Sequence, residues 1–250
     1  MINRRIAIVV IAFVAVVAAG GIAVYGTFLA GDNVPELGLD APSPSAPAAS
    51  PVSAASPTAA TPESGPSAAT GDLAGPWAVV SGVAGYRVRE TFLQQNAESD
   101  AVGRTEDVTG SLTVDGEAGT LRLASAQITV DMTTLRSDED RRDAQLRGRG
   151  IQSDTFPTST FDLATPVALP ADLTSGDVTL ELPGKLTLHG VARDVTITAQ
   201  ARLEADGTVV VVGSLPIRFA DYAIEPPSIA GIIAVQDNGS LEFRVVFAKG

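Results

Sequence analysis

The side chains that could perform chemistry in this sequence are few, and they match no known catalytic pattern. The chain has one histidine, His189, and no cysteine. A lone histidine cannot build a multi-histidine metal site, and the absence of cysteine excludes thiolate ligands, cysteine nucleophiles and disulfides. Carboxylates are abundant, but no spacing singles out a pair suited to acid–base catalysis. The sequence therefore predicts no metal site and no enzyme.

A local group of arginines is the strongest polar feature. Arginine matches the geometry of phosphate, so this group could meet a lipid head group or a pyrophosphate. Acidic residues at 138–140 and 143 favour a solvated helix with internal ion pairs instead. The arginines are Arg141, Arg142, Arg147 and Arg149.

The lone histidine stands at a turn. His189 precedes Gly190 between two alternating segments, and no serine near it forms a nucleophile-elbow pattern. We expect a structural hydrogen bond at a hairpin rather than a ligand contact. The net charge of −12 would repel phosphate backbones, so nucleic acid is excluded as a partner.

Residues 6–30 are uncharged and follow Arg4 and Arg5. A helix of this length would cover roughly 37 Å, enough to cross a hydrocarbon core of about 30 Å. This predicts a single-pass signal anchor, with residues 1–5 in the cytoplasm and the rest of the chain outside it. A cleaved signal peptide is the alternative, although its apolar core is usually about 7 to 15 residues. A twin-arginine export signal has weaker support.

Residues 31–73 have the composition of a disordered linker. Between 41 and 70 the sequence is almost entirely Ala, Pro, Ser and Thr, with seven prolines and one charged residue. Such a segment cannot bury enough apolar surface to fold. We expect a passive spacer between the membrane and a folded domain at 74–250.

The folded domain shows the two-residue period of β-strands. The expected strands lie near 77–92, 101–115, 119–132, 159–168, 177–188, 191–204, 208–219 and 240–248. Between Leu121 and Met132 the apolar residues change phase, which predicts a β-bulge near Ala124 or Ser125. About eight antiparallel strands joined by short turns suit a closed barrel, with a two-sheet sandwich as the alternative.

One helical segment, 138–149, interrupts the strands. Ser137 or Asp138 could cap its first turn, where acidic residues suit the helix dipole. The sequence RDAQL at 142–146 is similar to an Arg-Asp-x-His-Leu element of the YceI-like family, and TFPTSTF at 155–161 to the element that follows it. LTLHGVARDV at 186–195 and RFADY at 218–222 resemble two further motifs of the family. The resemblance covers essentially residues 77–248.

YceI-like proteins are extracytoplasmic, lipocalin-like barrels that bind polyisoprenoids. The resemblance implies a long apolar interior, closed partly by the helix and the loop after it. Phe156 and Phe161 would face the lipid tail, Pro157 would stiffen the turn between them, and Arg142 would pair with Asp143 or a neighbour. Two positions depart from the family pattern: Gln145 replaces the usual histidine, and Ile151 replaces an aromatic residue.

An isoprenoid tail needs only a dry and sufficiently long tube. Each apolar residue expected to line it is explained equally well by core packing when taken alone. The expected lining residues are Tyr86, Val88, Phe92, Ile128, Val130, Phe156, Phe161, Leu188, Phe219 and Phe243. The expected head-group contacts are Arg142, Arg147 and His189.

The sequence thus predicts a membrane-anchored, extracytoplasmic barrel. It would bind a polyprenyl chain or a prenylated quinone as a carrier, store or sensor, without a catalytic cofactor. The alternative is a ligand-free structural or interaction module on a stalk, with a solid barrel, and a hydrolase ranks third. The sequence does not indicate the oligomeric state.

Overall fold

The computed structural model describes residues 34–40, 73–93, 97–117, 119–226 and 233–250. The apolar run at 6–30 and most of the linker at 31–73 lie outside these residues, so the anchor and the spacer stay predictions. None of the helices in the described ranges combines the length and the apolarity needed to cross a bilayer. The described part of Glu36–Gly250 forms one compact unit.

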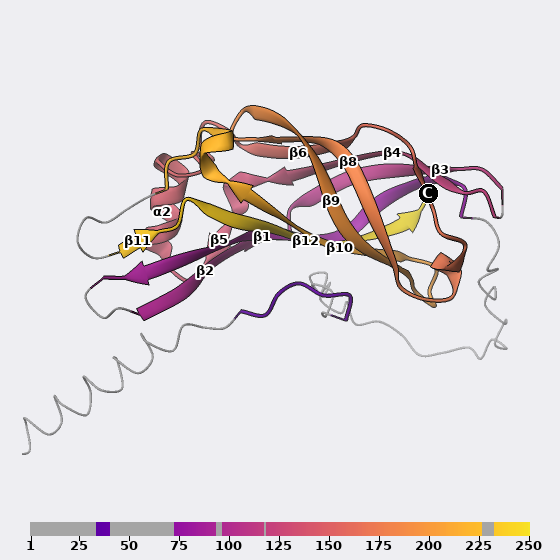
Figure 1. Cartoon of the computed structure of the whole chain (residues 1–250), viewed down its shortest axis with the longest axis horizontal. Helices are drawn as coiled ribbons and strands as arrows, with labels where there is room; N and C mark the ends of the chain where they lie inside the picture. The colour runs from indigo at the N-terminus through magenta and orange to yellow at the C-terminus, as the bar shows by residue number, and fades with distance from the viewer. Residues whose placement is uncertain (1–33, 41–72, 94–96, 118, 227–232) are drawn as a thin grey trace, which may run out of the picture. The chain divides into compact units, whose positions relative to one another are not determined.

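Eight long strands pair antiparallel in a closed ring, so the domain is an all-β barrel (Figure 1). Their order around the ring is β12-β10-β9-β8-β6-β4-β3-β1, and pairing of β1 with β12 closes it. This closure excludes the two-sheet sandwich. The strands are β1 (Gly75–Phe92), β3 (Val108–Asp115), β4 (Arg122–Asp131), β6 (Thr158–Leu163), β8 (Val178–Leu188), β9 (Val191–Leu203), β10 (Val209–Arg218) and β12 (Asn238–Lys249).

Shorter elements extend or cap the ring. β2 (Ala97–Thr105) pairs with the second half of β1, beyond the part that pairs with β3. Strands β5 and β11 pair with β2 and β1, and β7 pairs with β4. These elements are β5 (Arg136–Ser137), β7 (Val167–Ala168) and β11 (Ile233–Val235), the helix α2 (Asp140–Gly148), and the 3-10 turns η1 (Met132–Thr134), η2 (Ala171–Thr174) and η3 (Phe219–Tyr222).

Alternation of apolar and polar residues places the strands where the sequence predicts them, with two breaks, one of which divides the strand expected at 159–168 into β6 and β7. The strand expected at 101–115 is divided into β2 and β3. At the division, the backbone N–H of Asp107 donates to Thr105 Oγ1 (3.0 Å), and that of Val108 donates to the carbonyl of Glu106 (2.8 Å). These local bonds turn the chain, so one edge of β1 is covered by two shorter strands.

The predicted bulge is confirmed at Ala124. Between β3 and β4, Thr113 pairs with Ser125 and Val114 pairs with Leu123, so Ala124 has no partner. The extra residue returns the apolar residues on both sides of it to the same face of the sheet. A second bulge in β1 leaves Val80 between the paired residues Val79 and Ser81.

His189 and Gly190 form the two-residue turn between β8 and β9. Leu188 pairs with Val191, and both turn residues have positive φ, 52° and 72°. This is the backbone of a type I′ turn, whose twist matches the flanking strands. The His189 side chain is buried, and its Nδ1 lies 2.9 Å from the carbonyl oxygen of Tyr222. The expected hydrogen bond at a hairpin is therefore present.

The helix α2 begins later than expected and has a different cap. The Glu139 carboxylate accepts the backbone N–H of Arg141 at 3.3 Å, so Glu139 is the N-cap rather than Ser137 or Asp138. Ser137 instead donates its hydroxyl to Asp143 at 2.7 Å. Of the partners that the family resemblance implied for Arg142, Asp143 or a neighbour, the structure shows the neighbour Asp138.

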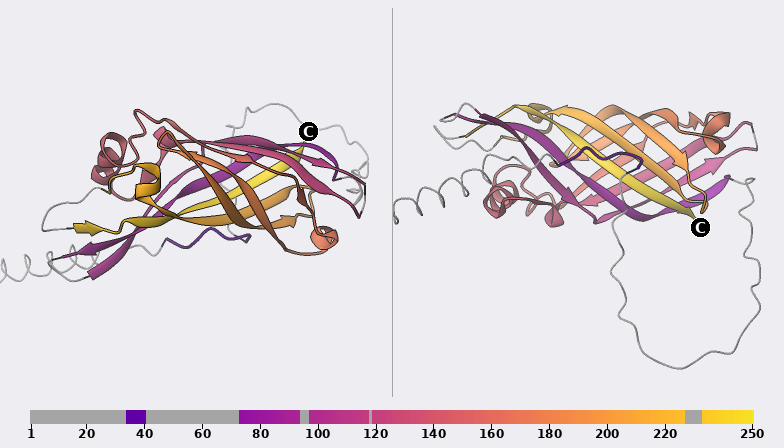
Figure 2. Two further views of the ribbon diagram at one scale, coloured as in Figure 1. Left: turned by 45° about the horizontal axis from the view of Figure 1, so that its top comes forward. Right: turned by 90° about the horizontal axis from the view of Figure 1, so that it is seen from below.

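The barrel has two distinct ends (Figure 2). The α2 end carries α2, β11 and the end of β1 at Phe92. The C-terminal end carries Gly75, Lys249 and the turn between Leu203 and Val209. Since β1 crosses from one end to the other, its 18 residues correspond to a length of roughly 60 Å along the wall.

Candidate ligand-binding cavity

The barrel encloses a cavity of about 250 Å³ that runs from the C-terminal end to the α2 end. All eight ring strands contribute to its wall, which is almost entirely apolar. An apolar cavity of about 150 Å³ is already large enough to hold benzene and to stay free of water. The interior can therefore accept a hydrocarbon rather than solvent.

Residues of the insertion between β4 and β6 complete the wall at the α2 end. Leu135, Leu146 and Ile151 line the cavity there, beside Met132. Ile151 occupies the position where the family pattern has an aromatic residue. Its smaller side chain also lines the cavity. The insertion therefore forms part of the cavity wall, as the resemblance to the YceI-like family implies.

Most of the apolar residues expected to line a cavity lie on its wall. Their positions follow strand parity, because alternate residues of each strand face inward. Their contact with a ligand stays a prediction. The wall includes Tyr86, Val88, Ile128, Val130, Phe161, Leu188, Phe219 and Phe243.

Glycines on neighbouring strands let three aromatic rings lie against the wall. A Cβ on Gly184 would approach the Phe161 ring to 2.3 Å, one on Gly213 would approach Phe243 to 2.6 Å, and one on Gly103 would approach Tyr86 to 2.3 Å. Each ring thus occupies the space that a side chain on the neighbouring strand would need. A larger residue at these glycines would push the rings toward the cavity axis.

Phe156 and Phe92 do not line the cavity, which corrects two of the expected positions. The Phe156 ring packs edge-on against His189, with ring centroids 4.4 Å apart, and covers Gly190. It therefore supports the β8–β9 turn instead of facing a tail. Phe92 is on the inward face of β1, two residues beyond Glu90. It lies in the part of β1 that pairs with β2 and β11, and it is not one of the wall residues.

A polar group marks the α2 end of the cavity. Tyr86, Glu90 and Arg142 all belong to the wall. Arg142 donates to the Glu90 carboxylate at 3.2 Å and to Asp138 at 2.5 Å, and its side chain is 19% exposed. Burial alone would lower the pKa of Arg142, but the charges of Glu90 and Asp138 outweigh that effect and raise it. The guanidinium is therefore already neutralised by two carboxylates.

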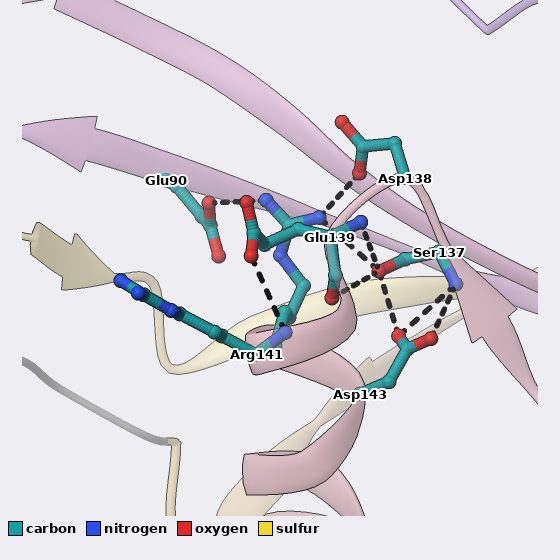
Figure 3. A network of polar contacts seen from close by, with 7 residues as sticks. Glu90, Ser137, Asp138, Glu139, Arg141 and Asp143 are labelled. Carbon is teal, nitrogen blue, oxygen red and sulfur yellow. Dashed lines mark hydrogen bonds and ion pairs between the residues drawn. The ribbon is translucent and has the colours of Figure 1, made fainter.

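A second layer of hydrogen bonds fixes this end (Figure 3). Asp143, buried in the first turns of α2, accepts from the Ser137 backbone N–H at 3.0 Å and from its hydroxyl. Arg142 also donates to the Ser137 hydroxyl at 3.3 Å. Since Ser137 belongs to β5, which pairs with β2, the network ties α2 to the barrel wall.

The Tyr86 hydroxyl is an unsatisfied polar atom on the cavity wall at this end. It is buried and has no hydrogen-bond partner of normal geometry among the described residues. Burial raises the pKa of Tyr86 well above its ordinary value of 10.0, against smaller lowering effects of Arg142 and Ser137. The phenol therefore stays protonated and can donate a hydrogen bond. A buried donor without a partner is costly, so a ligand acceptor would satisfy it.

Two of the three expected head-group contacts lie away from the cavity. Arg147 borders a separate small hollow beside Asp143 and Ser153. His189 is held by Tyr222 and Phe156, and its Nε2 is buried without a partner in the described part of the chain. Of the three residues, Arg142 is the one on the cavity wall.

Glu90 and the Tyr86 hydroxyl are polar features that the sequence analysis missed. The available signal was parity: Tyr86, Val88 and Glu90 alternate on one face of β1, so Glu90 has to face inward. The described ranges contain no group of three or more His, Asp or Glu side chains arranged to hold a metal. The cavity thus combines a long apolar wall with a polar group at one end.

The chain matches a known protein family and is similar to a curated protein. Residues 83–247 match the family described as YceI-like domain. The UPF0312 protein VVA0736 of Vibrio vulnificus is 32% identical over 99 residues, which are 39% of this chain and 48% of that protein. The chain thus aligns with about half the length of this curated relative.

Solved structures share the fold. A polyisoprenoid binding domain from Saccharophagus degradans, described as implicated in plant cell wall breakdown, superposes with a TM-score of 0.51 at 17% identity. The match covers 70% of this chain and 98% of that domain. BcnA of Burkholderia cenocepacia gives a TM-score of 0.47 at 23% identity, over 64% of this chain and 95% of its own.

Proposed function

The chain belongs to the YceI-like domain family, and from this premise we propose that it is a binding protein for an isoprenoid lipid. The proposal includes an N-terminal membrane anchor and a barrel outside the cytoplasm. The protein would carry, store or sense the lipid without changing it chemically. The similar domain from Saccharophagus degradans is described as polyisoprenoid binding, which supports this ligand class.

The observation that carries the proposal is the cavity itself. Its wall is almost entirely apolar from the C-terminal end up to the polar group at the α2 end, and its volume is about 250 Å³. Each square ångström of apolar tail surface removed from water contributes roughly 25 cal/mol, so a long hydrocarbon would gain affinity without any charged contact. A ligand-free structural module would have no need for this space.

The polar end favours a neutral head group over a phosphate. Arg142 is the one arginine among the described wall residues, and it is already engaged by two carboxylates, Glu90 and Asp138. A phosphate there would lie close to the Glu90 carboxylate, and like charges in a buried site repel strongly. The free donor is the neutral Tyr86 hydroxyl. A prenylated quinone offers a carbonyl acceptor on an apolar tail and fits both features.

The test uses two ligands with the same tail and the single variant Tyr86→Phe. Wild-type protein should bind a prenylated benzoquinone more tightly than the matching prenyl phosphate. Because one hydrogen bond contributes about 1 kcal/mol, Tyr86→Phe should weaken quinone binding about fivefold and leave phosphate binding unchanged. Tyr222→Phe is a matched control, since Tyr222 is buried beside the barrel but is not part of the cavity wall. The proposal would be rejected if neither ligand bound to the wild-type protein at micromolar concentration.

A further inference from the structure

Part of the outer wall formed by β10 and β12 is an apolar cluster that is buried from solvent. Val210, Val212 and Val246 face outward, yet their exposed fractions are 2%, 6% and 7%. The neighbouring inward residues Val209 and Val211 line the cavity. The run of four valines at 209–212 therefore has both of its faces buried, which requires a cover on the outside.

The cover is the segment Glu36–Asp40, which we call the strap. Leu39 is 8% exposed and packs with Val210, Val212 and Val246, and Leu37 packs against the same cluster. At one end of the strap, Asp40 pairs with Arg202 of β9 at 2.8 Å. At the other end, the charge of Glu36 helps raise the pKa of Arg87 on β1, after the larger effect of the hydrogen bond with Glu242.

The ion pair of Asp40 with Arg202 fixes one end of the strap, and the electrostatic effect of Glu36 on Arg87 indicates the direction of the other end. Arg202 is one residue from the end of β9 and belongs to the C-terminal end of the barrel. Arg87 pairs with Ser240 and lies five residues before the end of β1 at Phe92. The chain therefore enters the strap on the side of the α2 end and leaves it toward the C-terminal end.

The length of chain before the strap limits where a membrane can be. Six residue steps separate Ala30, the last residue of the apolar run, from Glu36. An extended chain spans at most about 3.5 Å per residue, or about 21 Å in total. Along β1, Arg87 is about 17 Å from Phe92 and about 40 Å from Gly75. The α2 end is within this reach, and the C-terminal end is not.

An exposed apolar residue lies at the α2 end. Leu93, which follows the last residue of β1, is 51% exposed and is one of two large apolar side chains that the described ranges leave open to solvent. The other, Val80, is the bulged residue near the opposite end of β1. Single exposed apolar side chains are common on protein surfaces, so Leu93 serves here as a position for a label and does not by itself indicate a membrane contact.

We propose that the strap orients the barrel, holding its α2 end and the polar end of the cavity against the membrane. The proposal rests on the proposed function, because it uses the N-terminal anchor. The linker at 41–72 then follows the strap in the sequence and does not set the distance between barrel and membrane. A lipid would enter from the bilayer tail first, and its head group would stop at Tyr86.

The experiment uses the full chain, whose lack of cysteine permits single labels. Leu93→Cys labels the α2 end and Ala205→Cys labels the turn at the C-terminal end. Each fluorescent protein is reconstituted in phosphatidylcholine vesicles containing a lipid with a nitroxide on its head group. The label at position 93 should be quenched at least threefold more than the label at position 205.

The strap is then weakened at its exposed ends by Glu36→Arg with Asp40→Arg, which places like charges beside Arg87 and Arg202. Quenching at the two positions should become equal within a factor of about 1.5. The matched control, Glu117→Arg with Asp154→Arg, changes the charge equally at exposed sites away from the strap and should keep the difference. Leu39→Ser tests the apolar contact separately, with circular dichroism to verify folding.

Three results would overturn the proposal. Equal quenching at both positions in the wild-type chain would show that the barrel is not oriented. A difference that survives both strap variants would show that the strap does not orient it. If the chain did not associate with vesicles, the proposed N-terminal anchor would be disproved. Lipid extraction from the same sample would then show whether the cavity still binds lipid.

Discussion

The two ends of the cavity are built from different chemistry. At the α2 end, Tyr86, Glu90 and Arg142 belong to the wall. At the C-terminal end, the described lining residues are apolar and include Trp77, Val114, Leu123, Leu173 and Phe247. A ligand with a polar head and a hydrocarbon tail therefore has one favourable orientation. The difference also separates two kinds of variant, those that change head-group recognition and those that change the length of tail accepted.

The largest effect is expected from breaking the ion pair at the polar end. Arg142→Met leaves the Glu90 carboxylate buried without its partner, which should lower the free energy of unfolding by about 3 kcal/mol. Urea denaturation measures this change. Arg149→Met, at an exposed position after the same helix, is the control and should cost less than about 0.5 kcal/mol. The double variant Glu90→Gln with Arg142→Met should recover most of the loss. An equal cost for Arg142→Met and Arg149→Met would contradict the account.

A charge in the middle of the cavity should affect binding at both ends. Phe161→Asp places a carboxylate on the apolar wall and should reduce lipid affinity about 100-fold, because burying an unpaired charge is strongly unfavourable. Phe156→Asp should keep affinity within about threefold, since that ring supports the β8–β9 turn outside the cavity. Val80→Asp, on the exposed bulge, controls for the added charge. Titration with a prenylated quinone distinguishes these variants, and a loss in Phe156→Asp equal to that in Phe161→Asp would show that the wall is assigned incorrectly.

The apolar end should determine the length of tail. Ala126 lines the cavity on β4 near Leu123, so Ala126→Phe fills space that the end of a long tail would occupy. Affinity for a long prenylated quinone should fall about tenfold, a loss of about 1.4 kcal/mol, while a quinone with a short tail should bind almost as before. Isothermal titration with both ligands tests this selectivity. Equal losses for both tails would indicate general distortion of the barrel.

The smallest effect is expected from pH. Burial raises the pKa of Tyr86 above its ordinary 10.0, so the hydroxyl remains protonated, and its hydrogen bond remains available, at every pH below 10. Quinone affinity should therefore change less than about twofold between pH 5 and 9. A phosphate head group would behave differently, because its second ionisation falls near pH 6. A transition in quinone affinity near neutral pH would contradict the role assigned to Tyr86.

Strand parity explains why much of the barrel could be predicted from the sequence. Inward residues of β8, β9 and β12 alternate without interruption, so their boundaries agree with expectation within about two residues. The bulge at Ala124 was predictable because it changes the phase of the apolar residues. The break between β2 and β3 was not, because it depends on local bonds at Thr105 and Glu106 that leave the alternation almost intact.

The cavity wall was predictable only where strands supply it. Phe161 follows from parity on β6, whereas Phe156 lies in an irregular loop, and no periodicity says which way its ring points. Glu90 was missed because inward parity was applied to apolar residues alone. The strap was missed because Leu37 and Leu39 lie in a segment with linker composition, although the four valines of β10 already indicated that both faces of that strand are covered.

The most direct test of the central claim is the lipid content of the protein. The full chain is purified from membranes, its bound lipids are extracted into organic solvent, and they are identified and counted by mass spectrometry. We predict about one prenylated lipid with a neutral oxygen-containing head group per chain, and its loss in Phe161→Asp. Wild-type protein that carries no prenylated lipid and takes none up from a supplied quinone would contradict a lipid-binding barrel.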